Sequence, residues 1–272
     1  MRYSDVALFT DLDGTLFNSA REVSPENRQA IAYFMENGGS FGISTGRAPV
    51  NALEMLPGLT MNAWSVVLNG AEAYHFLEQR AASQSLLPKQ EMEDLIRWVY
   101  ENLPDVNIQL CTDDRLLFLS RPEYADADFV ETHQPMAEVS VDEALAYPWL
   151  KVLFCAPRPR LEVLHDHAQA SGAAALMDSV YTHQTYLEYL PRNTNKGTCL
   201  KALRREPELQ GKTFVAIGDY TNDLELLAEA DVAVAVANAL PEVKAVADHI
   251  VCSNDEHALA YLIHNVIPGL ER

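Results

Sequence analysis

Between residues 5 and 80, apolar and polar residues follow a pattern that predicts strands and helices in alternation. An apolar run at residues 6–9 indicates the first strand. Ser24-Pro25 is typical of a helix N-cap followed by proline in the first helical position, and the apolar stripe after it continues to Gly38-Gly39. Residues 41–44 and 64–68 predict two more strands, with a helix near 50–56 between them.

The alternation returns near the C-terminus. Residues 214–217, 232–236 and 250–251 predict strands, and residues 224–230, 241–247 and those from about 256 predict helices. A repeated strand–helix order implies parallel strands joined by helical crossovers. We therefore predict an α/β fold with a doubly wound, Rossmann-like parallel sheet, built from residues 1–81 and 191–272.

Residues 82–190 have a different texture. They predict helices at 89–102 and 160–171 and β-like stretches at 107–110, 116–119, 150–155 and 186–190. This mixture indicates an α+β domain inserted into the doubly wound one.

Polar clusters follow several of the predicted core strands. These clusters are Asp11 with Asp13, Thr45-Gly46-Arg47, Asn69-Gly70 and residues 219–223, and Lys196 begins a predicted helix. A single cluster of this kind would indicate only a loop. A lysine in a helix is usually exposed to solvent, so Lys196 alone would not indicate a site. Because all strand C-termini of a parallel sheet open on one side, several clusters there indicate a binding or catalytic site.

Asp11 and Asp13 carry the most specific chemistry. Two carboxylates crowded at a strand end repel each other unless a cation or a shared proton relieves the charge. That pattern suggests a Mg²⁺ site in which one carboxylate is a nucleophile and the other moves protons. A surface turn also favours Asp and Gly, so this motif alone does not decide between the two interpretations.

Composition limits the classes of partner. The chain has 272 residues, 48% hydrophobic and 22% charged, as in an ordinary globular protein. Its 39 acidic and 20 basic residues give a net charge of −19. This charge disfavours nucleic acid or an anionic membrane as partner. A small phosphorylated substrate remains compatible, because a bound metal and a few fixed cations can reverse the local sign.

The cysteines and the apolar segments indicate a location. The four cysteines are widely spaced, without metal-binding spacing, which favours reduced thiols in the cytoplasm: Cys111, Cys155, Cys199 and Cys252. No apolar leader follows Arg2, and no run reaches the length of a membrane span. We therefore expect a cytoplasmic protein; the sequence carries no signal for its oligomeric state.

Four motifs in order resemble the haloacid dehalogenase superfamily. They are Asp-Leu-Asp-Gly-Thr-Leu at residues 11–16, Ser-Thr-Gly-Arg at 44–47, Asn-Lys-Gly at 195–197 and Gly-Asp-x-x-Asn-Asp at 218–223. The chain most resembles the Cof-type phosphatases, which carry a large C2-type cap between the second and third motifs. The interval from Asp13 to Thr45 holds only one helix and one strand, whereas the interval from Thr45 to Lys196 has room for a cap.

The resemblance implies a role for each motif residue. Asp11 would be the nucleophile that forms an aspartyl-phosphate, and Asp13 would protonate the leaving alcohol and then activate water. Mg²⁺ would be held by the Asp11 side chain, the Asp13 main-chain carbonyl and Asp219, with Asp223 at the metal site as a ligand or close behind the ligands. The phosphoryl oxygens would be bound by the Thr45 hydroxyl, the Leu12 and Gly46 amides, Lys196 and Asn222.

Other positions are less defined. Arg47 either contacts the substrate or the cap, or braces the core through a salt bridge. Asn69-Gly70 resembles a turn that shapes the floor of the site, and Asn238 resembles a residue that supports it from behind. The chain departs from its relatives at Tyr220, which could narrow the entrance or point away, in the absence of glycine before Asn238, and at His257, where glycine is common.

The leading interpretation is a Mg²⁺-dependent phosphatase acting on a small phosphorylated metabolite such as a sugar phosphate. The cap would close over the leaving group, exclude water and set specificity, with Glu188 as one candidate residue. A phosphomutase would use the same Asp11 and Asp13. A dehalogenase would not need the acid at Asp13, and a non-catalytic binding protein would not need the full set of catalytic groups.

Overall fold

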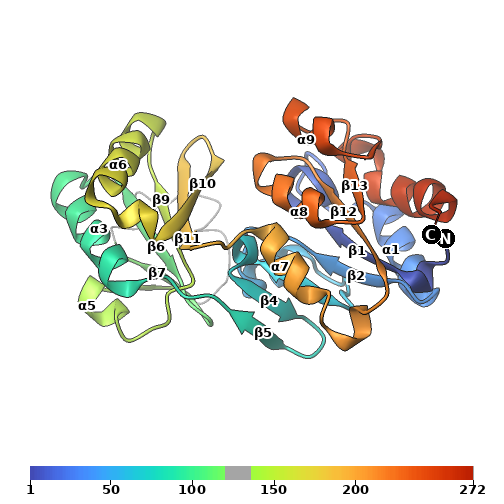
Figure 1. Ribbon diagram of the computed structural model, residues 1–272, viewed down its shortest axis with the longest axis horizontal. Helices are drawn as coiled ribbons and strands as arrows, with labels where there is room; N and C mark the ends of the chain where they lie inside the picture. The colour runs from blue at the N-terminus through green and yellow to red at the C-terminus, as the bar shows by residue number, and fades with distance from the viewer. Residues whose placement is uncertain (120–135, 272) are drawn as a thin grey trace. The chain divides into compact units, whose positions relative to one another are not determined.

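The chain separates into two compact units in the computed structural model, which describes residues 1–119 and 136–271 (Figure 1). The first, here the core unit, comprises Met1–Ser83 and Asn195–Arg272. The second, the inserted unit, comprises Gln84–Thr194. Along the chain, the order of the units is therefore core, insertion, core.

The core unit is built on a five-stranded parallel sheet in the order β14-β13-β12-β1-β2. The strands are β1 (Val6–Thr10), β2 (Ser40–Ile43), β12 (Thr213–Gly218), β13 (Val232–Ala235) and β14 (His249–Ile250). Every residue of β1 is buried, since β1 lies between β12 and β2 with helices on both faces. The predicted doubly wound α/β fold with an inserted α+β domain is confirmed.

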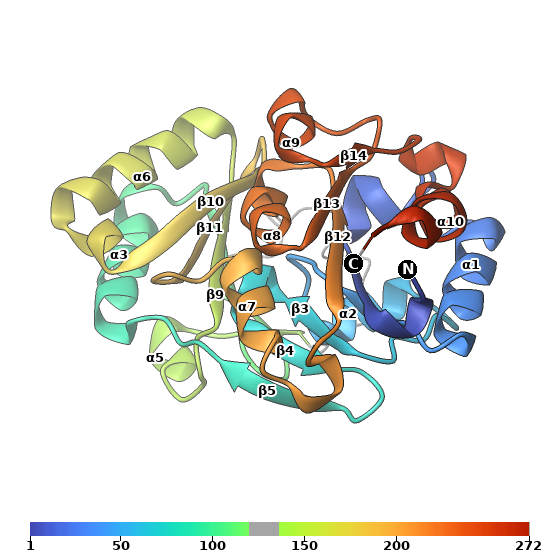
Figure 2. The same ribbon diagram turned by 45° about the vertical axis from the view of Figure 1, so that its right-hand side comes forward.

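Helices cover both faces of this sheet. They are α1 (Pro25–Glu36), α2 (Pro49–Met55), α7 (Lys196–Leu203), α8 (Leu224–Glu229), α9 (Pro241–Val246) and α10 (Ala258–Tyr261). Ser24 caps α1 as predicted, because its Oγ accepts a hydrogen bond from Asn27 N at 3.2 Å. In Figure 2, α1 and α10 lie on one side of the sheet and α7 and α8 on the other.

β3 (Trp64–Val67), which was predicted as the third parallel strand, lies parallel to the end of β2: Ser44 and Val66 form a parallel bridge, and Thr45 N donates to Val66 O at 2.9 Å. On its other side β3 pairs antiparallel with β4 (Glu72–His75), in a three-stranded sheet that ends with β5 (Arg80–Gln84). The reason for the antiparallel pairing is the tight turn after β3, where residues 68–70 all have positive φ. So short a connection returns the chain beside the strand it has just left.

The inserted unit is an α+β domain with a six-stranded sheet in the order β10-β11-β9-β6-β7-β8. Its strands are β6 (Asn107–Cys111), β7 (Leu116–Phe118), β8 (Met136–Glu138), β9 (Lys151–Cys155), β10 (Met177–His183) and β11 (Tyr186–Pro191). Its helices are α3 (Lys89–Asn102), α5 (Val141–Ala144) and α6 (Arg158–Ser171). Apolar residues of α3 and α6 share a core with alternate residues of the sheet, such as Val152 and Phe154.

The strand residues that alternate with these apolar ones lie on the opposite face of the six-stranded sheet, and they include buried polar groups. Lys151 Nζ forms an ion pair with Glu188 Oε1 at 3.1 Å, and both side chains are buried. Thr182 donates a hydrogen bond to the same Glu188 oxygen at 3.1 Å. Buried charges require such partners, so Glu188 is held within the sheet.

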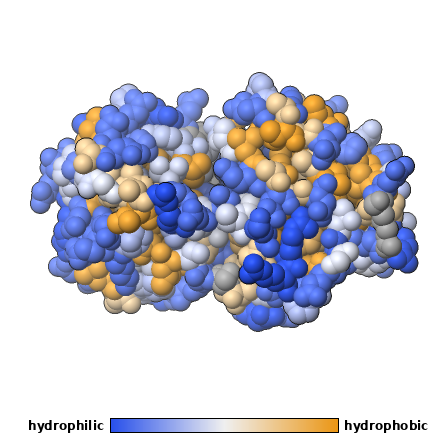
Figure 3. All heavy atoms as spheres, viewed as in Figure 1, coloured by the Kyte–Doolittle hydropathy of each residue, from blue (hydrophilic) through white to orange (hydrophobic). Residues whose placement is uncertain are grey.

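Hydrophilic residues cover most of the face drawn in Figure 3. All four cysteines are free. Among residues 1–119 and 136–271, no helix is both long and apolar enough to span a membrane.

Candidate active site

Asp11 lies at the carboxyl edge of the central strand, where its backbone N donates to Ile217 O of β12 at 2.9 Å. The chain then turns sharply through residues 12–16, with Gly14 at φ +84°. A Cβ on Gly14 would lie 2.5 Å from Asp219 Oδ2. Thr15 Oγ1 donates to Asp219 Oδ1 at 2.8 Å, so the first motif is fastened directly to the fourth.

Asp223 orders the loop after β12. Its Oδ2 accepts hydrogen bonds from Asp219 N at 2.9 Å and from Tyr220 N at 3.2 Å. Gly218 leaves room for this side chain, because a Cβ there would lie 2.5 Å from Asp223 Cγ. The loop therefore keeps Asp219 and Asp223 beside Asp11.

Lys196 forms ion pairs with both Asp11 and Asp223. Its side chain is fully buried, and its Nζ donates to Asp11 Oδ1 at 2.7 Å and to Asp223 Oδ1 at 2.6 Å. The start of α7 that carries Lys196 is capped by Asn195, whose Oδ1 accepts from Thr198 N at 2.8 Å. Gly70 lets the turn after β3 approach this start, since a Cβ there would lie 2.2 Å from Asn195 O.

The electrostatics of this cluster favour a further cation. Burial, together with Asp223 and Asp219, raises the pKa of Asp11 well above its ordinary value despite the opposing effect of Lys196. Burial and Asp223 raise the pKa of Asp219 to about 7. Burial alone would lower the pKa of Lys196, but Asp11 and Asp223 outweigh it and keep the ammonium charged. One ammonium does not balance three carboxylates.

Asp11, Asp219 and Asp223 meet the chemical requirements of a magnesium site. Each offers a carboxylate oxygen within 4.8 Å of the others. Hard oxygen donors of this kind suit Mg²⁺. Asp13 does not belong to this group through its carboxylate, and the expected contribution of its main-chain carbonyl stays a prediction.

The Asp13 carboxylate is instead bound by Arg47. Nε of Arg47 donates to Asp13 Oδ2 at 2.8 Å, and Nη2 donates to Asp13 Oδ1 at 2.7 Å. The remaining terminal nitrogen of Arg47 donates to Asn51 Oδ1 at 2.8 Å. Arg47 therefore forms a salt bridge, and its partner is the candidate acid Asp13; its contact with substrate or cap stays a prediction.

The predicted phosphate-binding residues lie at the same edge of the sheet. Thr45 is buried, its N donates to Val66 O at 2.9 Å, and its Oγ1 accepts from Arg47 N at 3.1 Å. Asn69 lies beside Gly46, where a Cβ would be 2.9 Å from Asn69 Nδ2. Asn222 Nδ2 donates to Asn69 Oδ1 at 3.1 Å, which joins the fourth motif to the Asn69-Gly70 turn. The Leu12 amide belongs to the turn that follows Asp11.

Several supporting residues were not predicted from the sequence. Thr15 and Asn51 are examples, although Thr15 belongs to the first motif and adjoins the residues that were singled out. Asn238 was predicted to support the site, and its Nδ2 donates to Gly14 O at 2.7 Å. His257 takes up a left-handed conformation with φ 63°, a backbone conformation that favours glycine. Its ring Nδ1 lies 3.0 Å from Ser24 Oγ.

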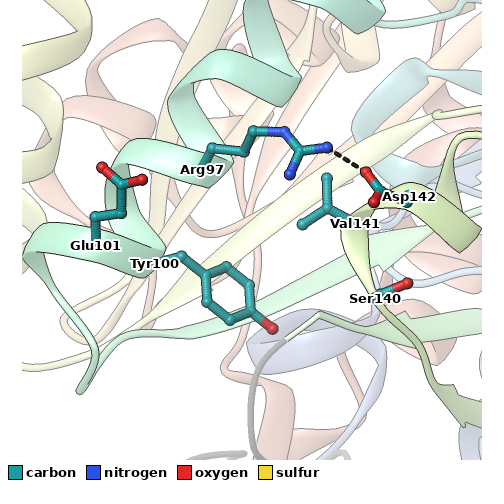
Figure 4. Close-up of a pocket in the computed structure, with 6 residues that line it drawn as sticks. All are labelled: Arg97, Tyr100, Glu101, Ser140, Val141 and Asp142. Atoms are coloured by element: carbon teal, nitrogen blue, oxygen red, sulfur yellow. Dashed lines mark hydrogen bonds and ion pairs between the residues drawn. The ribbon is translucent and has the colours of Figure 1, made fainter.

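A hollow of about 300 Å³ on the inserted unit lies between α3 and α5 (Figure 4). Arg97, the cation among its lining residues, is paired with Glu93 and Asp142. Charges already paired in this way leave little to recognise a ligand, so this hollow is not the candidate site.

Comparison with known proteins places these observations in a family. Residues 8–263 match the family model of haloacid dehalogenase-like hydrolases. Phosphatase YwpJ of Bacillus subtilis (strain 168) is 26% identical, over 94% of this chain and 98% of the relative. The 5-amino-6-(5-phospho-D-ribitylamino)uracil phosphatase YwtE of the same organism is 26% identical, over 95% and 97%.

The fold has close counterparts among solved structures. A haloacid dehalogenase-like hydrolase from Bacteroides thetaiotaomicron superposes with a TM-score of 0.82 at 23% identity, over 94% of this chain and 97% of that chain. At this identity the likeness concerns the fold alone. The family model covers nearly the whole chain and all four motifs, which confirms the predicted superfamily and the predicted class of enzyme. The chain therefore belongs to the haloacid dehalogenase-like hydrolases.

Proposed function

We propose that this chain is a Mg²⁺-dependent phosphatase that hydrolyses a small phosphorylated metabolite through an aspartyl-phosphate. The observation that carries the proposal is the buried Lys196 ammonium, bonded to Asp11 and Asp223 at the edge where Thr45, Gly46 and Asn222 also lie. A carboxylate can attack a phosphate dianion only where fixed positive charge and N–H donors offset their mutual repulsion. The family match and the relatives named phosphatases support the same activity.

The first step joins the enzyme to the phosphoryl group. An Asp11 carboxylate oxygen forms a bond to phosphorus while the bond from phosphorus to the alcohol oxygen breaks. The electron pair of that bond stays on the alcohol oxygen, which takes a proton from the Asp13 carboxylic acid. Lys196, Asn222, the Thr45 hydroxyl and the amides of Leu12 and Gly46 bind the phosphoryl oxygens in this scheme.

The second step releases inorganic phosphate. Asp13, now a carboxylate, removes a proton from water as the water oxygen bonds to phosphorus. The bond from phosphorus to Asp11 breaks and its electron pair returns to the Asp11 carboxylate. Both aspartates are then in their starting states.

Asp11, Asp219 and Asp223 would hold the magnesium ion, with the Asp13 carbonyl as a fourth protein ligand. When bound, Mg²⁺ supplies positive charge that offsets the negative charge of the attacking carboxylate and the phosphoryl group. The three clustered carboxylates, two with raised pKa values, support this assignment.

We propose a sugar phosphate or a similar polyol phosphate as the substrate class, used in the cytoplasm. The relative whose name specifies a 5-phospho-D-ribityl group supports a phosphate carried on a polyol chain. The charge of −19 disfavours a polyanionic substrate such as nucleic acid.

The inserted unit would act as the cap that selects this substrate. Glu188 remains the candidate for a specificity residue, now as one half of a buried ion pair with Lys151. Glu188→Gln keeps the size of the side chain, and the exposed Glu101→Gln on α3 is its control. A substrate profile unchanged in Glu188→Gln would remove Glu188 from this role.

The activity is tested by measuring inorganic phosphate released from sugar phosphates, nucleotides and cofactor phosphates, each with Mg²⁺ and with EDTA. Wild type should release phosphate only with Mg²⁺, and Asp11→Asn should release none. The surface variant Asp255→Asn is the matched control and should stay active. Isomerised phosphate ester without net release would indicate a phosphomutase. Mg²⁺-dependent binding without turnover of any compound would indicate a binding protein.

A further inference from the structure

Arg47 donates hydrogen bonds to both oxygens of the Asp13 carboxylate. The two contacts, 2.8 Å from Nε and 2.7 Å from Nη2, form the parallel fork that gives guanidinium–carboxylate pairs their fixed geometry. The Arg47 side chain is only 20% exposed, whereas that of Asp13 is 51% exposed. The more buried partner therefore holds the more exposed one.

Asp13 needs such a restraint more than Asp11 does. Its backbone lies in the kink after β1, with φ −78° and ψ 114°, and both Asp13 and the following Gly14 lie outside the helical conformation. A half-exposed aspartate receives little restraint from packing, and its side chain can sample several rotamers. An acid that must reach one oxygen of the substrate loses efficiency if it samples other positions.

Arg47 is itself anchored at three points of the core unit. Its backbone N donates to Thr45 Oγ1 at 3.1 Å, and its backbone O accepts from Leu68 N at 3.0 Å. Its remaining terminal nitrogen donates to Asn51 Oδ1 on α2 at 2.8 Å. The fork is thus fixed to the same loop that carries Thr45 and Gly46.

We propose that Arg47 is a positioning residue for Asp13, which orients this carboxyl group for proton transfer to the leaving group. In the transfer step, Asp13 keeps one bond to Arg47 and presents its other oxygen to the alcohol oxygen. The proposal rests on the proposed phosphatase function and adds a role for Arg47 that acts only through Asp13. Asn51 contributes indirectly, by holding the guanidinium.

This role has a specific kinetic consequence. A general acid accelerates loss of a poor leaving group such as an alkoxide, and matters little for a leaving group that is stable as an anion. Removing the Arg47 side chain should therefore slow the hydrolysis of alkyl phosphates far more than the hydrolysis of 4-nitrophenyl phosphate. A residue that only braced the fold, or one that bound the phosphoryl group, would slow both kinds of substrate equally.

The test measures kcat/KM for alkyl and aryl phosphates, because this ratio reports the steps through the first phosphoryl transfer. Arg47→Ala should lose roughly 10- to 100-fold on alkyl esters and less than about 5-fold on 4-nitrophenyl phosphate. Asn51→Ala should show the same selectivity with a smaller loss. Arg47→Lys, which keeps the charge but not the fork, should fall between wild type and Arg47→Ala.

Two comparisons make the result decisive. Arg204 is the matched control, since it is 30% exposed and paired with Asp231 at 3.0 Å in the same unit. Arg204→Ala should leave the ratio of alkyl to aryl activity unchanged. In an Asp13→Asn background, replacing Arg47 should cause no further loss on alkyl esters.

An equal loss on alkyl and aryl esters in folded Arg47→Lys and Asn51→Ala, or a full further loss in the Asp13→Asn background, would overturn the proposal. The second outcome would mean that Arg47 contacts the substrate directly. These outcomes require an active wild type, so they are separate from failure of the proposed function, in which wild type itself releases no phosphate.

Discussion

Lys196 offers the sharpest test of the electrostatics of the site. Lys196→Met removes the ammonium and keeps most of the buried aliphatic chain. Asp11, Asp219 and Asp223 would then lie within 4.8 Å of one another without a protein cation among them. The variant should therefore be less stable than wild type, and its stability should depend more strongly on Mg²⁺.

The magnitude follows from the two buried ion pairs, at 2.7 Å and 2.6 Å. Removing one partner of a buried pair typically costs about 3–5 kcal/mol, because the remaining charge stays buried without compensation. At about 2–4 °C per kcal/mol for a protein of this size class, the melting temperature in EDTA should fall by roughly 6–20 °C. A cation that binds only the folded state raises its stability by about 2.7 kcal/mol when the free cation concentration is 100 times its Kd.

The assay is thermal unfolding near neutral pH, in EDTA and over a Mg²⁺ titration. Lys151→Met is the matched control, since Lys151 is also buried and is paired with Glu188 at 3.1 Å. Both variants should lose stability in EDTA. Mg²⁺ should raise the melting temperature of Lys196→Met by more than it raises that of wild type or Lys151→Met.

Two results would refute this reasoning. If Lys196→Met is as stable as wild type in EDTA, the ammonium does not relieve repulsion among the carboxylates. If Mg²⁺ stabilises all three proteins equally, the ion does not bind beside Lys196.

Two further predictions concern pH and backbone geometry. Burial raises the pKa of Asp219 to about 7 in the folded chain, against about 4 when unfolded, so its contribution to stability is full below about pH 4 and is lost as pH rises to about 7. Urea unfolding in EDTA should show this fall, Mg²⁺ should reduce it, and a flat profile in EDTA would contradict it. Gly70 and Gly58 both have positive φ, but a Cβ clashes only at Gly70, with Asn195 O at 2.2 Å. Gly70→Ala should therefore destabilise the protein by more than the roughly 1 kcal/mol expected for Gly58→Ala and should reduce activity through Lys196; equal losses would exclude the clash.

The sequence by itself determined the parts of the fold that depend on local patterns. The helix at residues 89–102 was predicted with the bounds that α3 has, and Ser24 was identified as the cap of α1. Helical periodicity and capping act over a few residues, so one stretch of sequence contains the whole signal. Strands β10 and β5 were missed, since neither carries a continuous apolar run bounded by turn residues.

The four motifs were also visible in the sequence. Several of them follow predicted strands, and they could be assigned to one site because parallel strands bring their carboxyl ends to one edge of a sheet. Their order along the chain sufficed to indicate the superfamily. The specific roles of Asp11, Asp13, Thr45 and Lys196 stay proposals until activity is measured.

Only the tertiary structure decided which partners these residues have. A lysine at a helix start is usually solvated, and nothing near Lys196 in the sequence signals that its ammonium is buried between Asp11 and Asp223. The same holds for Arg47. The sequence left two roles open for it, and only the structure shows that its guanidinium donates to both carboxylate oxygens of Asp13. Such contacts join segments far apart in the chain, and their energies depend on burial and distance, which local sequence patterns do not encode.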